Sequence, residues 1–120
     1  MILKNLDNIN LDNFSIAIFG SGPAGITTAL ELEKKNIKCL LIEAGDEDYS
    51  EISQKFYEGK IIGDLITDLS ASRLRQFGGT SGHWGGWSKP MEKYNFKLWP
   101  LKDNELNPYS KKASEILSID

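Results

Sequence analysis

Two short apolar runs are separated by a segment with the pattern of an amphipathic helix. Residues 15–19 are Ser-Ile-Ala-Ile-Phe, and residues 38–43 are Lys-Cys-Leu-Leu-Ile-Glu. Apolar runs of this length, bounded by turn residues, are typical of strands buried in a parallel sheet. Residues 24–35 begin with small side chains and end with charged ones, which predicts a helix that stops at Asn36. The order strand, helix, strand predicts one right-handed βαβ unit over residues 15–43.

The segments on either side of this unit have weaker patterns. Residues 1–13 are rich in Asn and Asp, and we expect them to form a loosely packed lead-in segment. Residues 50–58 predict a short helix, whereas residues 64–76 have no clean period.

A further helix is expected over residues 103–117. Its opening residue is either Asp103 or Asn107. Pro108 is expected in its first turn, where the missing N–H of proline leaves no helical bond unmade.

The predicted elements do not enclose a core by themselves. Two parallel strands and one main helix leave a sheet face open, and parallel sheets need cover on both faces. We therefore expect residues 14–120 to be the N-terminal part of a larger α/β domain. Further chain or a partner polypeptide would supply the missing strands and the substrate domain.

A glycine-rich turn joins the first predicted strand to the helix. Its spacing is Gly20-x-Gly22-x-x-Gly25. The first glycine permits a tight turn, the second lets the backbone approach a pyrophosphate, and the third lets helix and strand pack closely. The start of the helix offers unpaired N–H groups and about half a positive charge, which suits a diphosphate. The candidate binding residues of this first glycine turn are Gly20, Ser21, Gly22, Pro23, Ala24 and Gly25.

Glu43 ends the second predicted strand, 18 residues after Gly25, and Ala44 follows it. A carboxylate there can accept hydrogen bonds from both ribose hydroxyls of an adenosine. It would repel a 2′-phosphate, so the pattern disfavours NADP. The alternative is a glycine-rich turn with Glu43 as a solvated strand end. These features do not separate NAD from FAD, because both cofactors carry the same adenosine diphosphate half.

A second glycine-rich segment covers residues 75–86. Five of the eleven residues 77–87 are glycine and two are tryptophan. Consecutive glycines leave backbone N–H groups unshielded, so a flat or charged ligand can come close. The candidate binding residues here are Arg75, Gly78, Gly79, Thr80, Ser81, His83, Trp84 and Gly85. Arg75 and Trp84 have plain alternatives, a solvated charge and ordinary aromatic packing.

Together the two motifs resemble the glucose–methanol–choline (GMC) oxidoreductases. That family opens with Gly-x-Gly-x-x-Gly and an acid-Ala-Gly strand end, matched by Glu43-Ala44-Gly45, and continues with Arg, Gly-Gly-[Thr/Ser]-Ser and Gly-Gly. Trp99-Pro100 and Leu106-Asn107-Pro108-Tyr109 are similar to a downstream segment of the family. The resemblance covers residues 14–118 and is nearest to pyranose oxidase and to the flavin subunits of gluconate and fructose dehydrogenases.

The resemblance implies a Rossmann-like FAD-binding fold and FAD as the cofactor. It also implies hydride transfer from an alcohol or sugar CH–OH group to flavin N5, with a histidine in the C-terminal part of the enzyme as the base. No histidine follows His83 in this chain, so we assign no catalytic residue and expect no turnover by the chain alone.

His83 has a specific counterpart in the pyranose oxidase branch. There, a Ser-x-His-Trp segment carries a histidine bonded covalently to the flavin 8α-methyl group, and Ser81-Gly82-His83-Trp84 matches it. Two alternatives are a histidine that contacts a non-covalent flavin and a solvated loop histidine. In this same branch some members carry a hydroxyl residue where this chain has Gly85.

The composition limits the other classes of function. With 14 Lys and Arg against 17 Asp and Glu, the net charge is −3, which argues against nucleic acid as a partner. One cysteine and one histidine predict no disulfide and no metal site. No apolar run predicts a membrane span, and without a signal-peptide pattern the simplest location is the cytoplasm. Two alternative functions remain, an NAD-linked Rossmann dehydrogenase and a non-catalytic nucleotide-binding remnant.

Overall fold

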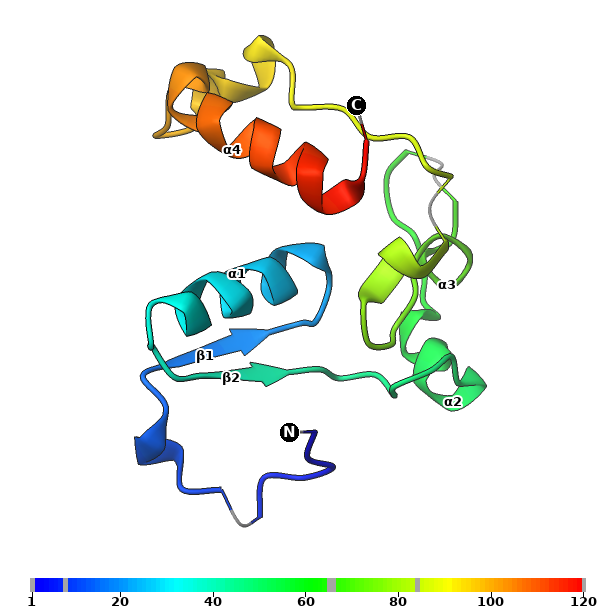
Figure 1. Cartoon of the computed structure of the whole chain (residues 1–120). Helices are drawn as coiled ribbons and strands as arrows, with labels where there is room; N and C mark the ends of the chain where they lie inside the picture. Colours follow the sequence, from blue (N-terminus) through cyan, green and yellow to red (C-terminus); the bar gives the residue numbers. More distant parts are fainter. Residues whose placement is uncertain (1, 8, 65–66, 84, 120) are drawn as a thin grey trace. The chain divides into compact units, whose positions relative to one another are not determined.

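The structure is a computed structural model with two compact units, residues 1–84 and residues 85–120, each described by itself (Figure 1). The described residues are 2–7, 9–64, 67–83 and 85–119. The first unit contains β1 (Ile16–Phe19), α1 (Pro23–Lys34), β2 (Cys39–Ile42), α2 (Glu51–Gln54), α3 (Leu69–Ser72) and the 3₁₀ helices Leu11–Asn13, Lys55–Tyr57 and Gly79–His83. The second unit contains the 3₁₀ helix Lys93–Leu98 and the helix α4 (Asp103–Leu117).

The strand–helix–strand prediction is confirmed. β1 and β2 are parallel, with a register that runs from Ile16 opposite Cys39 to Phe19 opposite Ile42. α1 connects them and covers one face of this two-stranded sheet (Figure 1). Each element agrees with its predicted range to within one residue at either end. The fold is therefore mixed α/β with a small parallel sheet.

The end of α1 follows from Asn36, as the sequence predicts. This residue has a φ of 56°, a left-handed conformation that asparagine tolerates better than most side chains. Its N–H donates to the Glu33 carbonyl at 2.8 Å, and the Ile37 N–H donates to the Leu32 carbonyl at 3.0 Å. This pair of bonds is a Schellman motif, which satisfies the last carbonyls of the helix and turns the chain toward β2.

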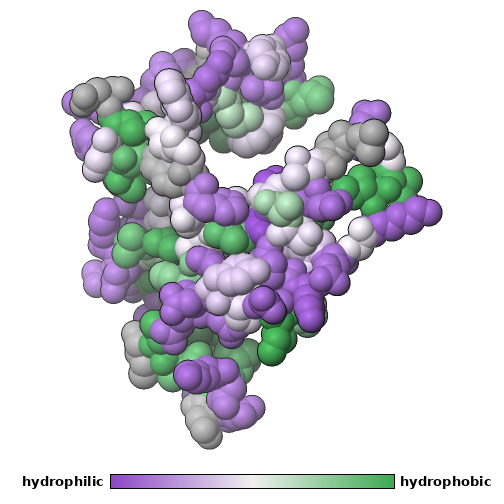
Figure 2. All heavy atoms as spheres, turned by 90° about the vertical axis from the view of Figure 1, so that its right-hand side faces the viewer, coloured by the Kyte–Doolittle hydropathy of each residue, from purple (hydrophilic) through white to green (hydrophobic). Residues whose placement is uncertain are grey.

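The sheet has two apolar faces, and only one of them meets α1. Ile18 lies under the helix, 3.5 Å from the place that a Cβ on Gly25 would take. Phe19 follows on the opposite face and is 80% exposed. Among the described residues no hydrophobic side chain is fully buried, and Figure 2 shows hydrophobic side chains at several places on the surface. These residues therefore contain no closed apolar core.

The lead-in segment lies on the side of the sheet away from α1 (Figure 1). The regular element among its described residues is the 3₁₀ helix Leu11–Asn13, where the Asn10 side chain accepts a hydrogen bond from the Asp12 N–H at 3.1 Å. Leu3, Leu6 and Leu11 are exposed. The segment thus adds little apolar cover to the sheet.

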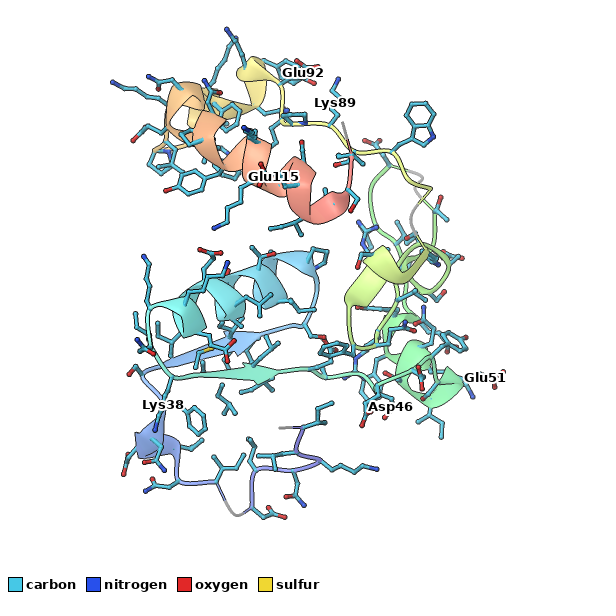
Figure 3. The ribbon with its side chains drawn as sticks, viewed as in Figure 1. Lys38, Asp46, Glu51, Lys89, Glu92 and Glu115 are labelled. Carbon is cyan, nitrogen blue, oxygen red and sulfur yellow. The ribbon has the colours of Figure 1, made fainter. Side chains whose placement is uncertain are left out.

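The second unit is built around α4, which confirms the helix predicted over residues 103–117. The helix begins at Asp103, because the Glu105 carboxylate accepts a hydrogen bond from the Lys102 N–H at 2.7 Å and so fixes the first turn. Pro108 consequently lies in the second turn of the helix, and its expected place in the first turn is wrong. Upstream, Lys89 and Glu92 form an ion pair (Figure 3).

Within the described parts of the chain, every helix is too short or too polar to cross a bilayer.

Candidate functional site

A cavity of about 680 Å³ lies in the first unit, at the carboxyl ends of β1 and β2. Ligands of open α/β sheets bind at this end of the strands, because the loops there are free to surround them. Nine candidate residues from the sequence line it: Gly20, Gly22, Pro23, Glu43, Ala44, Arg75, Gly79, Thr80 and Ser81. Five further lining residues are Phe19, Ile42, Tyr57, Leu74 and Gln76.

Four other candidates belong to the same two glycine-rich stretches but do not line the cavity: Ser21, Ala24, Gly25 and Gly78. Ser21 is fully buried in the first glycine turn, and its carbonyl and hydroxyl oxygens accept hydrogen bonds from the Gly78 N–H at 3.1 and 3.2 Å. Ala24 and Gly25 form the first turn of α1. These residues therefore shape the cavity through the backbone and through Ser21.

Of the last three candidates, His83 is the one that the structure describes within the first unit. His83 ends the 3₁₀ helix that starts at Gly79; its side chain is exposed and is not among the described residues that line the cavity. The rise of a 3₁₀ helix is about 2 Å per residue, so His83 lies about 8 Å along the helix from Gly79, which lines the cavity. Trp84 lies outside the described residues, and Gly85 belongs to the second unit.

The first and third glycines of the first turn have the conformational and packing roles that their spacing predicts. Gly20 has a φ of +95°, which most side chains rarely adopt. A Cβ on Gly25 would stand 2.0 Å from the Gly20 carbonyl oxygen, so only glycine lets α1 approach β1 this closely. A Cβ on Gly22 would meet nothing within 4 Å. The backbone at Gly22 is therefore open to a ligand in the cavity.

The start of α1 is suited to a negatively charged group. Gly22 precedes the helix without a side-chain cap, and the described first turn contains no acidic residue. The first helical hydrogen bond runs from the Ile26 N–H to the Gly22 carbonyl at 3.0 Å. Because no cap satisfies the N–H groups of Ala24 and Gly25, they and the helix dipole can stabilise an anion there.

Two residues of the second glycine-rich segment, Gly78 and Gly79, lie directly against the first turn. The Phe77 N–H donates to the Asp46 carbonyl at 2.8 Å, and Asp46 and Gln76 form an isolated parallel bridge. Figure 3 shows Asp46 and Lys38 at opposite ends of the stretch that contains β2. A Cβ on Gly79 would be 3.4 Å from the Gly22 Cα. Two backbone stretches without side chains thus meet at one wall of the cavity.

A buried glutamine on α2 holds the beginning of this second segment. The Gln54 side chain is 7% exposed, and its Nε2 donates to the carbonyls of Ser70 at 2.7 Å and Arg73 at 2.5 Å. Its Oε1 accepts a hydrogen bond from the Arg75 N–H at 3.2 Å. Ser53, also buried, donates its hydroxyl to the Arg75 carbonyl at 2.9 Å. The helix predicted over residues 50–58 is α-helical only in α2 and continues as the 3₁₀ helix Lys55–Tyr57. Its α-helical part positions the cavity wall.

The Arg75 side chain is engaged within this wall. One guanidinium nitrogen donates to the Ser53 hydroxyl at 3.0 Å, and the guanidinium carbon lies 4.3 Å from the centre of the Phe56 ring. This cation–π contact holds the charge at the edge of the cavity. A guanidinium has five N–H donors, so others remain for a ligand.

Glu43 is held by hydrogen bonds from both neighbouring loops. Its Oε2 accepts from the Ser21 N–H at 2.8 Å and from the Ser21 hydroxyl at 2.6 Å, and its Oε1 accepts from the Gly45 N–H at 2.7 Å. Burial raises the pKa of Glu43, but the hydrogen bonds from Ser21, Gly45 and Ala44 together outweigh it and leave the pKa below its ordinary value. The carboxylate is therefore held in its charged form.

We expect Glu43 to make the folded state sensitive to acid. Because its pKa is lower in the folded chain, its stabilising contribution is complete above the ordinary glutamate pKa and is lost as the pH falls through the lower folded value. Thermal unfolding across this window should show a steeper loss of stability for the unmodified chain than for Glu43→Gln. Glu47→Gln, which alters an exposed acid of the same loop, should keep the steep loss. Equal slopes for all three chains would contradict this prediction.

Several residues that build this site were not among the candidates predicted from the sequence. Phe19 and Ile42 were visible only as the last apolar residues of the strands, whose carboxyl ends line such cavities. Gln54 and Tyr57 lie in a polar stretch with no motif. Gln76 lines the cavity, and its Oε1 is buried without a hydrogen-bond partner among the described residues.

A scan against protein-family models and searches of curated proteins and of solved structures find no match to this chain. The fold and the site themselves define the class of this chain. It is an α/β chain with a parallel βαβ unit and a glycine-lined cavity at the carboxyl ends of the strands.

Proposed function

We propose that this cavity binds FAD through its adenosine diphosphate half. The observation that carries the proposal is the meeting of the two glycine-rich stretches, where Gly79 lies against Gly22 at the start of α1. An NAD site needs only the first of these stretches. Two adjoining stretches of bare backbone suit a longer ligand that continues past the diphosphate.

The residues present fit such a ligand. The uncapped start of α1 would hold the diphosphate, with Gly22 leaving room for it. Glu43, charged and at the cavity wall, would accept a hydrogen bond from the ribose. Thr80 and Ser81 line the cavity farther along the second segment and would contact the part of the ligand beyond the diphosphate. We take the βαβ unit as the start of a Rossmann-like sheet.

We propose further that the chain is the FAD-binding part of an oxidoreductase that acts on CH–OH groups of alcohols or sugars. The resemblance of both glycine motifs to the GMC oxidoreductases supports this activity. When bound, FAD supplies a hydride acceptor, and the chain's own residues bind and orient it. Because the sequence has no histidine after His83, the base that removes the hydroxyl proton would come from further chain or from a partner chain.

Calorimetric titration of the full chain tests the cofactor. We expect FAD and ADP to bind, with FAD tighter than NAD because the second glycine-rich segment adds contacts beyond the diphosphate. NADP should bind more weakly than NAD, since its 2′-phosphate would approach the charged Glu43. Tighter binding of NAD than of FAD would favour the dehydrogenase alternative, and no binding of any of these ligands would refute nucleotide binding.

The same preparation tests covalent attachment through His83, which is part of this proposal. After loading with FAD and denaturation in acid, gel filtration should show the flavin absorbance eluting with the chain. His83→Ala should bind FAD but release all of it under the same treatment. Complete release from the unmodified chain would show that the histidine does not carry the flavin.

A further inference from the structure

Gln76 lines the cavity, and its side-chain oxygen has no hydrogen-bond partner among the described residues. This oxygen, Oε1, is buried. A buried acceptor without a partner costs stability, and most such groups in folded proteins are bonded to protein or to ordered water. Gln54 shows the contrast, because its amide bonds three backbone groups. The amide of Gln76 is therefore free to accept a donor that the described residues do not supply.

The backbone of Gln76 is held on both sides, whereas its amide can turn. Gln76 forms the isolated parallel bridge with Asp46, and its carbonyl accepts the Gly79 N–H at 2.9 Å. The torsion that orients a glutamine amide is broad, so the amide turns at little cost. Oε1 can thus meet a donor in the cavity without movement of the backbone.

The amide lies about one helical turn past the contact between the two glycine-rich stretches. A Cβ on Gly79 would be 3.4 Å from the Gly22 Cα, at the start of α1. A Cβ on Gly82 would instead be 3.2 Å from the Gln76 Nε2. Gly82 follows Gly79 by three residues, which make one turn of a 3₁₀ helix with a rise of about 6 Å. With the proposed diphosphate at Gly22, the amide lies beside the part of FAD that continues past it.

We propose that Gln76 is a specificity-determining residue, whose Oε1 accepts a hydrogen bond from the flavin half of bound FAD. The inference rests on the proposed FAD function and deepens it, because it names a side chain that distinguishes FAD from ADP. Two groups of the flavin half can donate, the ribityl hydroxyls and the N3–H of the ring. Both present the same chemistry to an amide oxygen, and a methylated flavin distinguishes them.

Calorimetric titration of Gln76→Met with FAD and with ADP tests the inference. Methionine has a similar length but no amide oxygen, so FAD should bind about fivefold more weakly than to the unmodified chain, or worse. ADP should bind within about twofold, because it ends at the diphosphate. Equal weakening of both ligands, or unchanged affinity for FAD, would overturn the inference while nucleotide binding itself stands. Failure of the unmodified chain to bind FAD would overturn the proposed function and this inference with it.

Thermal unfolding separates this role from a structural one. Because Oε1 of Gln76 bonds no described residue, Gln76→Met should not lower the unfolding temperature. Gln54→Met is the matched comparison, since it makes the same change at an amide that bonds three backbone groups. It should lower the unfolding temperature by about 4 °C or more. A comparable drop in both variants would show that Gln76 supports the fold and would overturn the inference.

Nuclear magnetic resonance of the unmodified chain tests the same contact without a substitution. The side-chain amide resonances of Gln76 should shift when FAD is added and stay in place when ADP is added. Titration with 3-methyl-FAD then identifies the donor: weaker binding than FAD assigns it to N3–H, and equal binding assigns it to the ribityl hydroxyls. Amide resonances of Gln76 that do not respond to bound FAD would overturn the inference.

Discussion

Gly22→Ala is expected to leave the fold intact and to weaken FAD and ADP binding by about 10- to 100-fold. The new methyl group meets no atom of the chain within 4 Å, and the backbone at Gly22, with φ −68° and ψ 176°, suits alanine. The methyl group would instead stand in the cavity at the start of α1. Stability should change by less than about 1 kcal/mol, because a stiffer unfolded chain offsets a poorer helix cap.

Thermal unfolding and calorimetric titration measure the two effects separately. The matched variant is Gly25→Ala, which adds the same methyl group three residues later. There the Cβ would lie 2.0 Å from the Gly20 carbonyl oxygen, a backbone atom that cannot move aside alone. We expect a loss of about 3 kcal/mol or more, a large part of the stability of a small domain, and with it loss of binding.

The two variants separate a binding role from a packing role. If Gly22→Ala binds ADP as tightly as the unmodified chain, the diphosphate does not lie at the start of α1 and the proposed site is wrong. If Gly25→Ala unfolds at the same temperature as the unmodified chain, the contact between α1 and β1 is looser than the structure describes.

The βαβ unit could be predicted because its signals are local. A run of apolar residues ending in glycine marks β1, and Asn36 marks the end of α1 through its own tolerance of positive φ. The first and third glycines of the turn also follow from neighbouring geometry. Each of these features depends on residues that are close together in the sequence.

The walls of the cavity could not be predicted because they depend on contacts between distant residues. The bonds from Gly78 to Ser21 join positions 57 apart in the sequence, and Gln54 bonds backbone groups 16 to 21 residues away. No period or motif reports such contacts. The hydrogen bonds from Ser21 to Glu43 are another contact of this kind. The sequence contains both residues but does not show that they bond to each other.

Gly45 illustrates the difference most sharply. In the sequence it is only the glycine of the acid-Ala-Gly stretch that follows the second strand. In the structure a Cβ on Gly45 would lie 2.2 Å from the carbonyl oxygen of Arg75 and 2.6 Å from the Gln76 nitrogen. The second glycine-rich segment can therefore reach Asp46 and the first turn only because position 45 has no side chain.

Gly45→Ala is accordingly expected to detach this segment and to weaken ADP and FAD binding at least tenfold, by about 1.4 kcal/mol or more. The atoms in the way are backbone atoms, so the segment must shift and the Phe77–Asp46 bond must break. The βαβ unit should survive, because no contact of α1 with either strand involves Gly45. Amide hydrogen exchange at Phe77 and Gly78 should therefore accelerate while exchange in α1 stays slow.

Gly59→Ala is the matched control, because a Cβ there meets nothing within 4 Å and the backbone does not require glycine. It should leave both the exchange pattern and the affinity unchanged. Acceleration in α1 as well as at Phe77 would mean that the βαβ unit depends on the segment for its own stability. Undiminished affinity in Gly45→Ala would show that the second glycine-rich segment takes no part in binding. In that case the first glycine turn alone would account for the site, and the preference for FAD over NAD would lose its structural basis.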